Sequence, residues 1–210
     1  MSLLMSPDGT FRAVLFELWK AAHTKDAQEP ESLSFWQHLL SKYEFKEDFW
    51  ICDAEIRPTA DSRRRIDRGI RFIEPNAREI VVLCWLEAKG VDTAEATRQS
   101  EAQALDACKL TLDNHPWQGH VYALTTTRTK AKAWMYERGD EYMIPLHEED
   151  YIEAHSSEGI KLRSAFERMK LITPAPVLGM DRSIAHLPAT GSGVADPTSM
   201  PNSMFPQHGA

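Results

Sequence analysis

Ile80-Val81-Val82-Leu83-Cys84-Trp85-Leu86-Glu87-Ala88-Lys89 decides the fold of this chain, because a long apolar run ends there in two charged residues. An apolar run of this length predicts a buried strand. Side chains alternate between the two faces of a strand, so Glu87 and Lys89 share one face. Burying charges is costly unless they are paired or bind a metal. The pattern therefore marks Glu87 and Lys89 as candidate functional residues.

A third charged residue belongs to the strand that is predicted just before this one. The segment Arg65–Ile73 alternates apolar and polar residues, as a half-buried strand does. If Ile73 pairs with Val81 in an antiparallel hairpin, Asp67 lies directly opposite Glu87. Opposed residues share a face, with Cβ atoms about 4.5–5.5 Å apart, so Asp67 would join the charged pair. A one-residue slip would send it to the other face.

An Asp on one strand and Glu-x-Lys on the next resembles the PD-(D/E)XK nuclease superfamily, over about residues 50–136. Ile66 stands where many members carry proline. The resemblance implies an α/β, restriction-endonuclease-like fold, a three-layer core with a mixed central sheet flanked by helices. It also implies a metal-dependent nuclease that hydrolyses phosphodiester bonds, in DNA rather than in RNA. The alternative is a catalytically inactive, nuclease-like binding or regulatory module.

The resemblance also implies roles for individual residues. Asp67 and Glu87 would bind Mg²⁺ or Mn²⁺ together with the carbonyl oxygen of Ala88, and such hard oxygen ligands suit these cations. Lys89 would orient or deprotonate the attacking water and offset developing negative charge. The simpler alternative is a salt bridge between Glu87 and Lys89 at a solvated strand end.

Two further candidates come from helices. Several nuclease families of this type carry a glutamine on the helix after Glu-x-Lys, which here selects Gln99, with Gln103 four residues later on the same helix face. An ordinary polar helix face explains both equally well. A third acid from the first helix is also common in the superfamily, and Glu17 is the candidate, although exposed helix glutamates are abundant.

The charge of the chain is −7, from 24 basic and 31 acidic residues. This balance argues against a general nucleic-acid coat protein, because phosphate binding usually requires a basic surface. Arginines nevertheless crowd the stretch around Asp67: Arg57, Arg63, Arg64, Arg65, Arg68 and Arg71. A solvated strand edge would explain them, but beside a candidate metal site they also suggest a DNA substrate, contacted by Arg64, Arg68 and Arg71.

The cysteines and the hydropathy of the chain indicate its cellular compartment and whether it contacts a membrane. The three cysteines are far apart and odd in number, which suggests neither a zinc site nor a disulfide framework. No apolar run reaches the roughly 18–20 residues that cross a bilayer, and the N-terminus has no signal-peptide pattern. We therefore expect an intracellular protein of the cytoplasm or nucleus, without a membrane partner. A homodimer is compatible with the resemblance, since single-domain nucleases that cut both strands often pair.

Two regions are predicted. Residues 1–173 would form a nuclease-like domain, with N-terminal helices within 10–45, a core over 49–137 and a C-terminal helix near 157–172. Strand-helix-strand at 80–126 predicts a crossover connection. Residues 174–210 hold six of the 12 prolines and four of the 10 glycines, which predicts a disordered Pro/Gly/Ser-rich tail. Its scattered apolar residues could anchor a protein partner.

Local signals predict where individual helices begin and which residues they bury. Asp8 or Thr10 is available as a cap for the first helix, and the second helix is expected to start near Ser32. Asp92–Glu95 reads as a capping box for a helix that continues to about Leu112. The last helix is expected to bury Ile160, Leu162, Phe166 and Met169.

Overall fold

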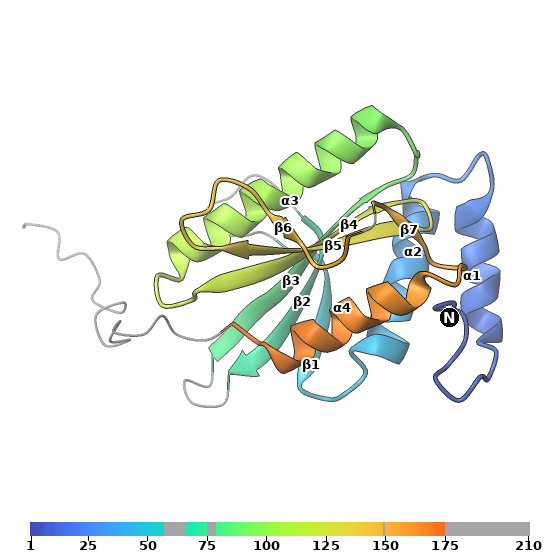
Figure 1. Ribbon diagram of the computed structural model, residues 1–210, viewed down its shortest axis with the longest axis horizontal. Coiled ribbons are helices and arrows are strands. Elements are labelled where there is room, and N and C mark those ends of the chain that lie inside the picture. Colours follow the sequence, from blue (N-terminus) through green and yellow to red (C-terminus); the bar gives the residue numbers. More distant parts are fainter. Residues whose placement is uncertain (57–65, 75–78, 149, 175–210) are drawn as a thin grey trace, which may run out of the picture.

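The computed structural model describes residues 1–56, 66–74, 79–148 and 150–174. Within them the chain is α/β, with a mixed sheet flanked by helices (Figure 1). In chain order the elements are α1 (Ala13–His23), α2 (Glu29–Leu39), the π-helical turn η1 (Leu40–Glu44), β1 (Trp50–Ile56), β2 (Ile66–Glu74), β3 (Glu79–Lys89), α3 (Ala94–Asn114), β4 (His120–Thr127), β5 (Lys130–Glu137), β6 (Ile144–Pro145), β7 (Ile152–Glu153) and α4 (Gly159–Leu171).

The sheet has the strand order β1-β2-β3-β4-β5-β6, and β7 pairs with β5. β3 and β4 are parallel, and the other neighbouring strands are antiparallel. Parallel neighbours need a crossover connection, and α3 provides it, as the sequence predicts. β3 is central and covered on both faces, which explains why its sequence is apolar without alternation.

Helices cover both faces of the sheet. On one face, α3 packs against a core that contains Trp85 and Trp134. On the other face, α1, α2 and α4 pack against a larger core that contains Trp36, Leu86 and Phe166. Trp85 and Trp134 therefore serve as packing residues beneath α3. Among the described helices, none is both long and apolar enough to cross a membrane.

The register of the β2–β3 hairpin differs from the predicted one near its turn. Ile73 pairs with Ile80 and not with Val81. A β-bulge follows, so that further along the ladder Arg68 pairs with Leu86. A bulge sets two residues of one strand against one of the other, and here it restores the predicted register toward the end that holds the charged residues.

The first helix is not capped as predicted. The residue before α1 is Arg12, and no side chain caps the helix. Asp8 instead closes its own turn, accepting hydrogen bonds from the Ser6 hydroxyl and from the Thr10 amide (2.9 Å for the latter). These hydrogen bonds lower the pKa of Asp8 to about 2. Its carboxylate is therefore engaged before the helix begins.

α2 and α3, in contrast, each begin at a capping residue. Thr93 caps α3 by accepting a hydrogen bond from the Ala96 amide at 3.2 Å, within the predicted capping segment. α2 starts at Glu29, earlier than predicted, because Gln28 and Glu31 form a capping box.

For the C-terminal part of the chain, the structure confirms only part of the prediction. In α4, Leu162, Phe166 and Met169 are buried as expected, but Ile160 is 43% exposed. The helix has a narrower buried face than the prediction assumed. The predicted tail lies outside the described residues, apart from Pro174.

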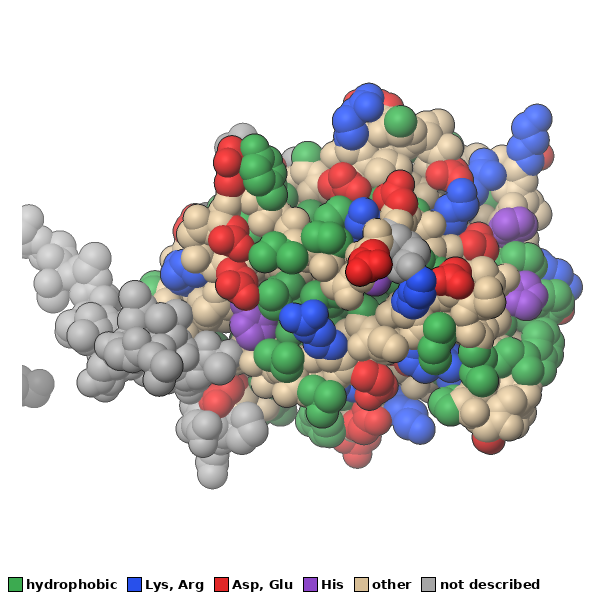
Figure 2. Space-filling model, viewed as in Figure 1, with side chains coloured by type: hydrophobic (Ala, Val, Ile, Leu, Met, Phe, Trp, Pro, Cys, Tyr) green, Lys and Arg blue, Asp and Glu red, His purple; other side chains and the backbone are tan. Residues whose placement is uncertain are grey.

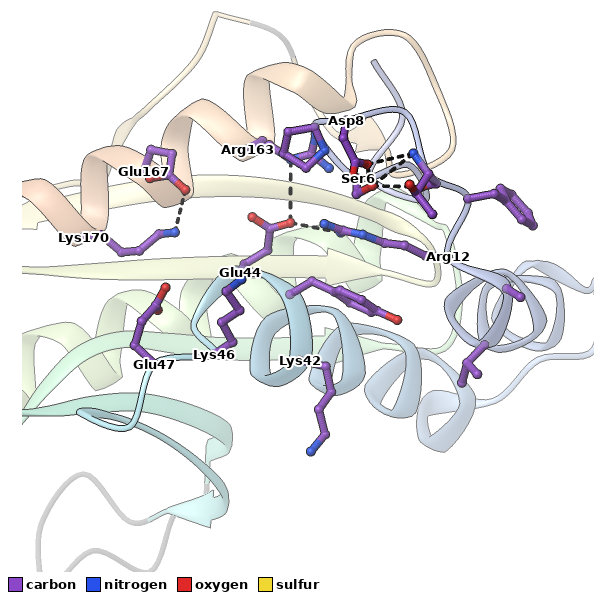
Figure 3. A pocket seen from close by; sticks show the side chains of 16 residues that line it. Ser6, Asp8, Arg12, Lys42, Glu44, Lys46, Glu47, Arg163, Glu167 and Lys170 are labelled. Carbon is purple, nitrogen blue, oxygen red and sulfur yellow. Dashed lines mark hydrogen bonds and ion pairs between the residues drawn. The ribbon is translucent and has the colours of Figure 1, made fainter.

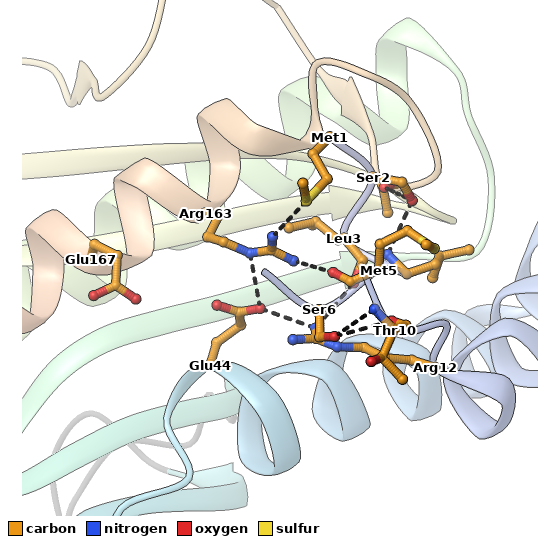
Figure 4. Close-up of polar contacts among 12 residues, drawn as sticks. Met1, Ser2, Leu3, Met5, Ser6, Thr10, Arg12, Glu44, Arg163 and Glu167 are labelled. Atoms are coloured by element: carbon orange, nitrogen blue, oxygen red, sulfur yellow. Dashed lines mark hydrogen bonds and ion pairs between the residues drawn. The ribbon is translucent and has the colours of Figure 1, made fainter. Parts of the chain in front are cut away.

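Three buried charged residues tie the N-terminal segment to the helical layer (Figure 4). Glu44 lies 3.3 Å from Arg12 Nη1 and 3.7 Å from Arg163 Nε. Arg12 also donates to the Leu3 carbonyl, and Arg163 donates to the Met5 carbonyl. Both guanidinium groups thereby hold backbone of the first five residues against η1 and α4.

We predict that Glu44→Gln destabilises the fold by about 3–5 kcal/mol, because two buried guanidinium groups lose their shared carboxylate. Chemical denaturation measures this difference. Glu167→Gln on α4 is the control, since Glu167 forms an i,i+3 pair with Lys170, and such surface pairs contribute about 0–1 kcal/mol. Equal effects of the two substitutions would contradict the prediction.

Candidate functional site at the C-terminal end of β3

The site forms where the β2–β3 ladder ends. Beyond the Arg68–Leu86 pair, the next antiparallel step sets Asp67 opposite Glu87. The Asp67 carboxylate accepts a hydrogen bond from the Ala88 amide, with 2.8 Å between Oδ2 and N. A side chain thus continues the ladder after the backbone pairing has ended, and it fixes the carboxylate beside Glu87-Ala88-Lys89.

The backbone of Ala88 faces the same side as Asp67. In a strand, the N–H and C=O groups of one residue point toward the same neighbouring strand. Since the Ala88 amide reaches Asp67 on β2, the Ala88 carbonyl also points toward β2. Lys89 faces the other way, and its carbonyl accepts from the Arg128 amide at 2.8 Å. The Asp67 carboxylate and the Ala88 carbonyl therefore lie on one side of β3.

The side chains of Glu87 and Lys89 point toward the α3 face of the sheet. Trp85 belongs to the core beneath α3, whereas Leu86 and Ala88 belong to the opposite core. Alternation along β3 therefore places Glu87 and Lys89 on the same face as Trp85. Glu87 is only 3% exposed, and Lys89 is half-buried. The structure brings the three predicted residues to one end of the sheet.

Arg128, in the turn between β4 and β5, holds this end of the sheet together. Its φ of +54° lies in the left-handed region that is uncommon outside glycine. Its carbonyl accepts from Ser32 Oγ at 2.7 Å and from Trp36 Nε1 at 2.8 Å. Its guanidinium donates to the carbonyls of Gly90 and Lys25. Arg128 thus fastens the start of α2 to the ends of β3 and β4.

Gly90 lets the first residues of α2 approach β3 closely. A Cβ at position 90 would lie 2.4 Å from the backbone nitrogen of Glu29, so a larger residue would push the helix away. The approach brings the Glu29 carboxylate close enough to Asp67 and Lys89 for their charges to affect its pKa. Burial and repulsion by Asp67 raise the pKa of Glu29, and attraction by Lys89 partly offsets this.

Glu29 is an acid near Asp67 and Lys89 that the sequence prediction did not name. Glu17, the predicted third acid, lies on α1 and pairs with Lys20, and its side chain is 68% exposed. Glu29 belongs instead to α2, which packs closely against Gly90 at the end of β3. The small residue Gly90 directly after Glu-x-Lys was the available signal.

The structure favours Gln103 over Gln99 as the helix glutamine. Thr97 and Glu101 line a groove on the β5 side of α3. At about 100° per residue, Gln99 and Gln103 fall on the opposite flank, toward β3 and β2. Gln99 is exposed, whereas the buried Oε1 atom of Gln103 has no hydrogen-bond partner among the described residues.

A polar network lies next to Glu87 on the other side. Thr125 is the strand neighbour of Glu87 in β4. The Thr125 hydroxyl lies 2.7 Å from the Tyr151 hydroxyl and accepts from Trp134 Nε1 at 2.8 Å. Tyr151 also donates to Glu101 at 3.2 Å, whose pKa is raised chiefly by burial. This network therefore lies beside Glu87, on the β5 side of the sheet.

Of the predicted arginine contacts, the two that the structure describes lie on opposite faces of β2. Arg64 lies outside the described residues. Arg71 lies on the same face of β2 as Asp67. Its Nε donates a hydrogen bond to Asp53 Oδ2 at 2.6 Å. Arg68 lies on the opposite face, beside Gln37 of α2. On the face of the molecule seen in Figure 2, basic and acidic side chains are interspersed.

The donor set at this end of the sheet is chemically suited to a hard divalent cation. It comprises the carboxylates of Asp67 and Glu87 and the carbonyl of Ala88, all oxygen donors. Only one Asp67 oxygen, Oδ2, is engaged by the Ala88 amide. Across the described ranges, no group of three or more His, Cys, Asp or Glu side chains is arranged to hold a metal ion.

Comparison with known proteins gives no family for this chain. No protein-family model matches it, and no match is found among curated proteins or solved structures. Functional inference therefore depends on the geometry of the site and on the resemblance of its motif.

We predict that Glu29→Gln stabilises the protein at about pH 7 and that this gain vanishes near pH 4. The pKa of Glu29 is raised above its ordinary value of 4.5, so the folded state binds the proton more tightly than the unfolded state. Above the raised pKa, the ionised carboxylate therefore favours unfolding, and below 4.5 it has no effect.

Urea denaturation at the two pH values measures this effect. Glu17→Gln is the control, and it should change stability little at either pH. If Glu29→Gln altered stability equally at both pH values, the raised pKa of Glu29 would be contradicted.

Proposed function

We propose that this protein is a metal-dependent nuclease of the PD-(D/E)XK type that hydrolyses phosphodiester bonds, in DNA rather than in RNA. The observation that carries the proposal is the hydrogen bond from the Ala88 amide to the Asp67 carboxylate. It aligns an acid of β2 with the Glu-x-Lys end of β3. Support for the restriction-endonuclease-like core comes from the α3 crossover, which leads from Glu-x-Lys to a parallel fourth strand.

Mg²⁺ or Mn²⁺ would be held by Asp67, Glu87 and the Ala88 carbonyl. When bound, such a cation polarises the phosphate and lowers the pKa of a coordinated water. The protein's own part is to keep these donors in place. The Ala88 amide orients the Asp67 carboxylate, and burial of Glu87 within the sheet restricts its movement.

Lys89 would act on the attacking water and on the phosphate. It lies two residues beyond Glu87 on the same face, so its ammonium group can donate hydrogen bonds to a water beside the carboxylates. Its positive charge offsets the negative charge that develops on the phosphoryl oxygens. Glu29, coupled to both Asp67 and Lys89, would help to position the ammonium group, and Gln103 would border the site from α3.

The arginines and the cysteines bear on the substrate and on the cellular compartment. Arg71 shares the face of Asp67 and is the described arginine best placed to contact a phosphate backbone, although it is paired with Asp53. Single-domain nucleases that cut both DNA strands often pair, so a homodimer is part of the proposal. The three cysteines are free, in keeping with a reducing, intracellular compartment.

A catalytically inactive binding or regulatory module is the second candidate. The net charge of −7 favours it, because nucleic-acid enzymes usually carry a basic surface. The presence of Asp67, Glu87 and Lys89 together favours the enzyme, since the loss of one of them would suffice to inactivate such a site.

We predict that the protein cleaves plasmid or single-stranded DNA with Mg²⁺ or Mn²⁺, and that Lys89→Ala lowers the rate at least about a hundredfold. Gel-based cleavage assays with and without a chelator measure both effects. Lys20→Ala is the matched control, because it removes the same charge from an exposed surface pair on α1.

Two other results of the cleavage assay would contradict this prediction. Cleavage that survives in Lys89→Ala would place the reaction elsewhere. The absence of cleavage in the wild-type protein, together with unimpaired DNA binding, would favour the inactive module.

A further inference from the structure

A second pocket lies on the other side of the sheet from α3. Its volume is about 860 Å³, and it is formed by residues 6–14, the turn η1 and the segment after it, and α4 (Figure 3). Its charged lining residues are Arg12, Lys42, Lys46, Arg163, Lys170, Asp8, Glu44, Glu47 and Glu167. None of them belongs to the candidate site on β3.

The buried charges of this pocket do not balance. Two guanidinium groups, of Arg12 and Arg163, share the single carboxylate of Glu44. Arg12 is 9% exposed and Arg163 is 7% exposed, so little solvent screens them. A buried charge without a counter-charge is costly. The cluster carries one positive charge in excess, which an anion would neutralise.

The same two residues have hydrogen-bond donors to spare. The buried Nε atoms of Arg12 and Arg163 have no hydrogen-bond partner among the described residues. Leaving a buried donor unsatisfied costs roughly 1–3 kcal/mol. The Tyr43 ring stacks against the Arg12 guanidinium, 4.1 Å from its central carbon, and fixes the plane of the group. Both guanidinium groups therefore line the pocket with donor capacity that the described residues do not satisfy.

The first turn of α1 adds to the positive potential. Ala13 and Val14 line the pocket, and α1 has neither a side-chain cap nor an acidic residue in its first turn. The free amide groups and the macrodipole at a helix N-terminus favour anions. A phosphate is a group that such an end commonly binds.

Two of the acidic lining residues are engaged by their own partners. Asp8 accepts hydrogen bonds from Ser6 and Thr10, and Glu167 pairs with Lys170.

The π-helical turn that carries Glu44 is a rare conformation, often found at functional sites. Lys42 and Lys46, on and just after this turn, line the pocket as well.

We propose that this pocket binds a phosphate monoester group, with Arg12 and Arg163 at its base and Lys42 and Lys46 at its edge. The proposal does not depend on the nuclease activity of the β3 site. A free phosphorylated small molecule and the 5′-phosphate of a nucleic acid present the same group, and the experiment separates these two sources.

Isothermal titration calorimetry with inorganic phosphate is the test, at low ionic strength and on the full chain. Lys42 and Lys46 are changed together to alanine, because Arg12 and Arg163 also hold the fold. The control is the double variant Lys20→Ala, Lys161→Ala, which removes the same charge from surface pairs outside the pocket. We expect saturable binding with a dissociation constant in the millimolar range or below, weakened roughly fivefold or more only in the pocket variant.

A second titration uses a short oligonucleotide in chelator, with either a 5′-phosphate or a 5′-hydroxyl. Tighter binding of the phosphorylated form, lost in the pocket variant, would support the proposal and identify a nucleic-acid end. Binding of free phosphate alone would support it and identify a small phosphorylated ligand. The proposal is overturned if wild-type protein does not bind phosphate saturably, or if both double variants bind it equally.

Discussion

The hydrogen bond between the Ala88 amide and the Asp67 carboxylate is the contact on which the candidate site depends. Backbone pairing between β2 and β3 ends at Arg68 and Leu86, and the Asp67 side chain takes the place of the next backbone partner. A carboxylate that accepts a hydrogen bond from a backbone amide loses rotational freedom. The Asp67 carboxylate is therefore held in one orientation beside Glu87. One interaction thereby both ends a strand ladder and positions an acid.

The surroundings reinforce this end of the sheet from two directions. Arg128 fastens the ends of β3 and β4 to α2, and the absence of a side chain at Gly90 lets Glu29 approach. The result is a concentration of charge that a purely structural strand end would not need. Burial and, after it, repulsion by Asp67 raise the pKa of Glu29, and proteins commonly accept such costs at functional sites.

Sequence reasoning recovered what depends on local pattern. The apolar run of β3, the cap at Thr93 and the crossover by α3 all follow from nearby residues. The bulge in the β2–β3 ladder was missed. The early start of α2 was missed as well, because a glutamine cap decides it. Glu29 depends on packing between distant segments, which no local periodicity reports, and the difference between Gln99 and Gln103 depends on how α3 lies on the sheet. The two buried arginines around Glu44 belong to the same class.

Calorimetric titration of Mn²⁺ into the metal-free protein tests the central claim most directly, because the claim is that Asp67 and Glu87 form one oxygen-donor site. Asp67→Asn keeps an acceptor for the Ala88 amide and removes only the charge, so the strand register is preserved. We expect saturable binding by wild-type protein, unchanged in the surface variant Glu17→Gln and weakened at least roughly tenfold in Asp67→Asn. Equal affinity in all three proteins, or no saturable binding in any, would contradict the account.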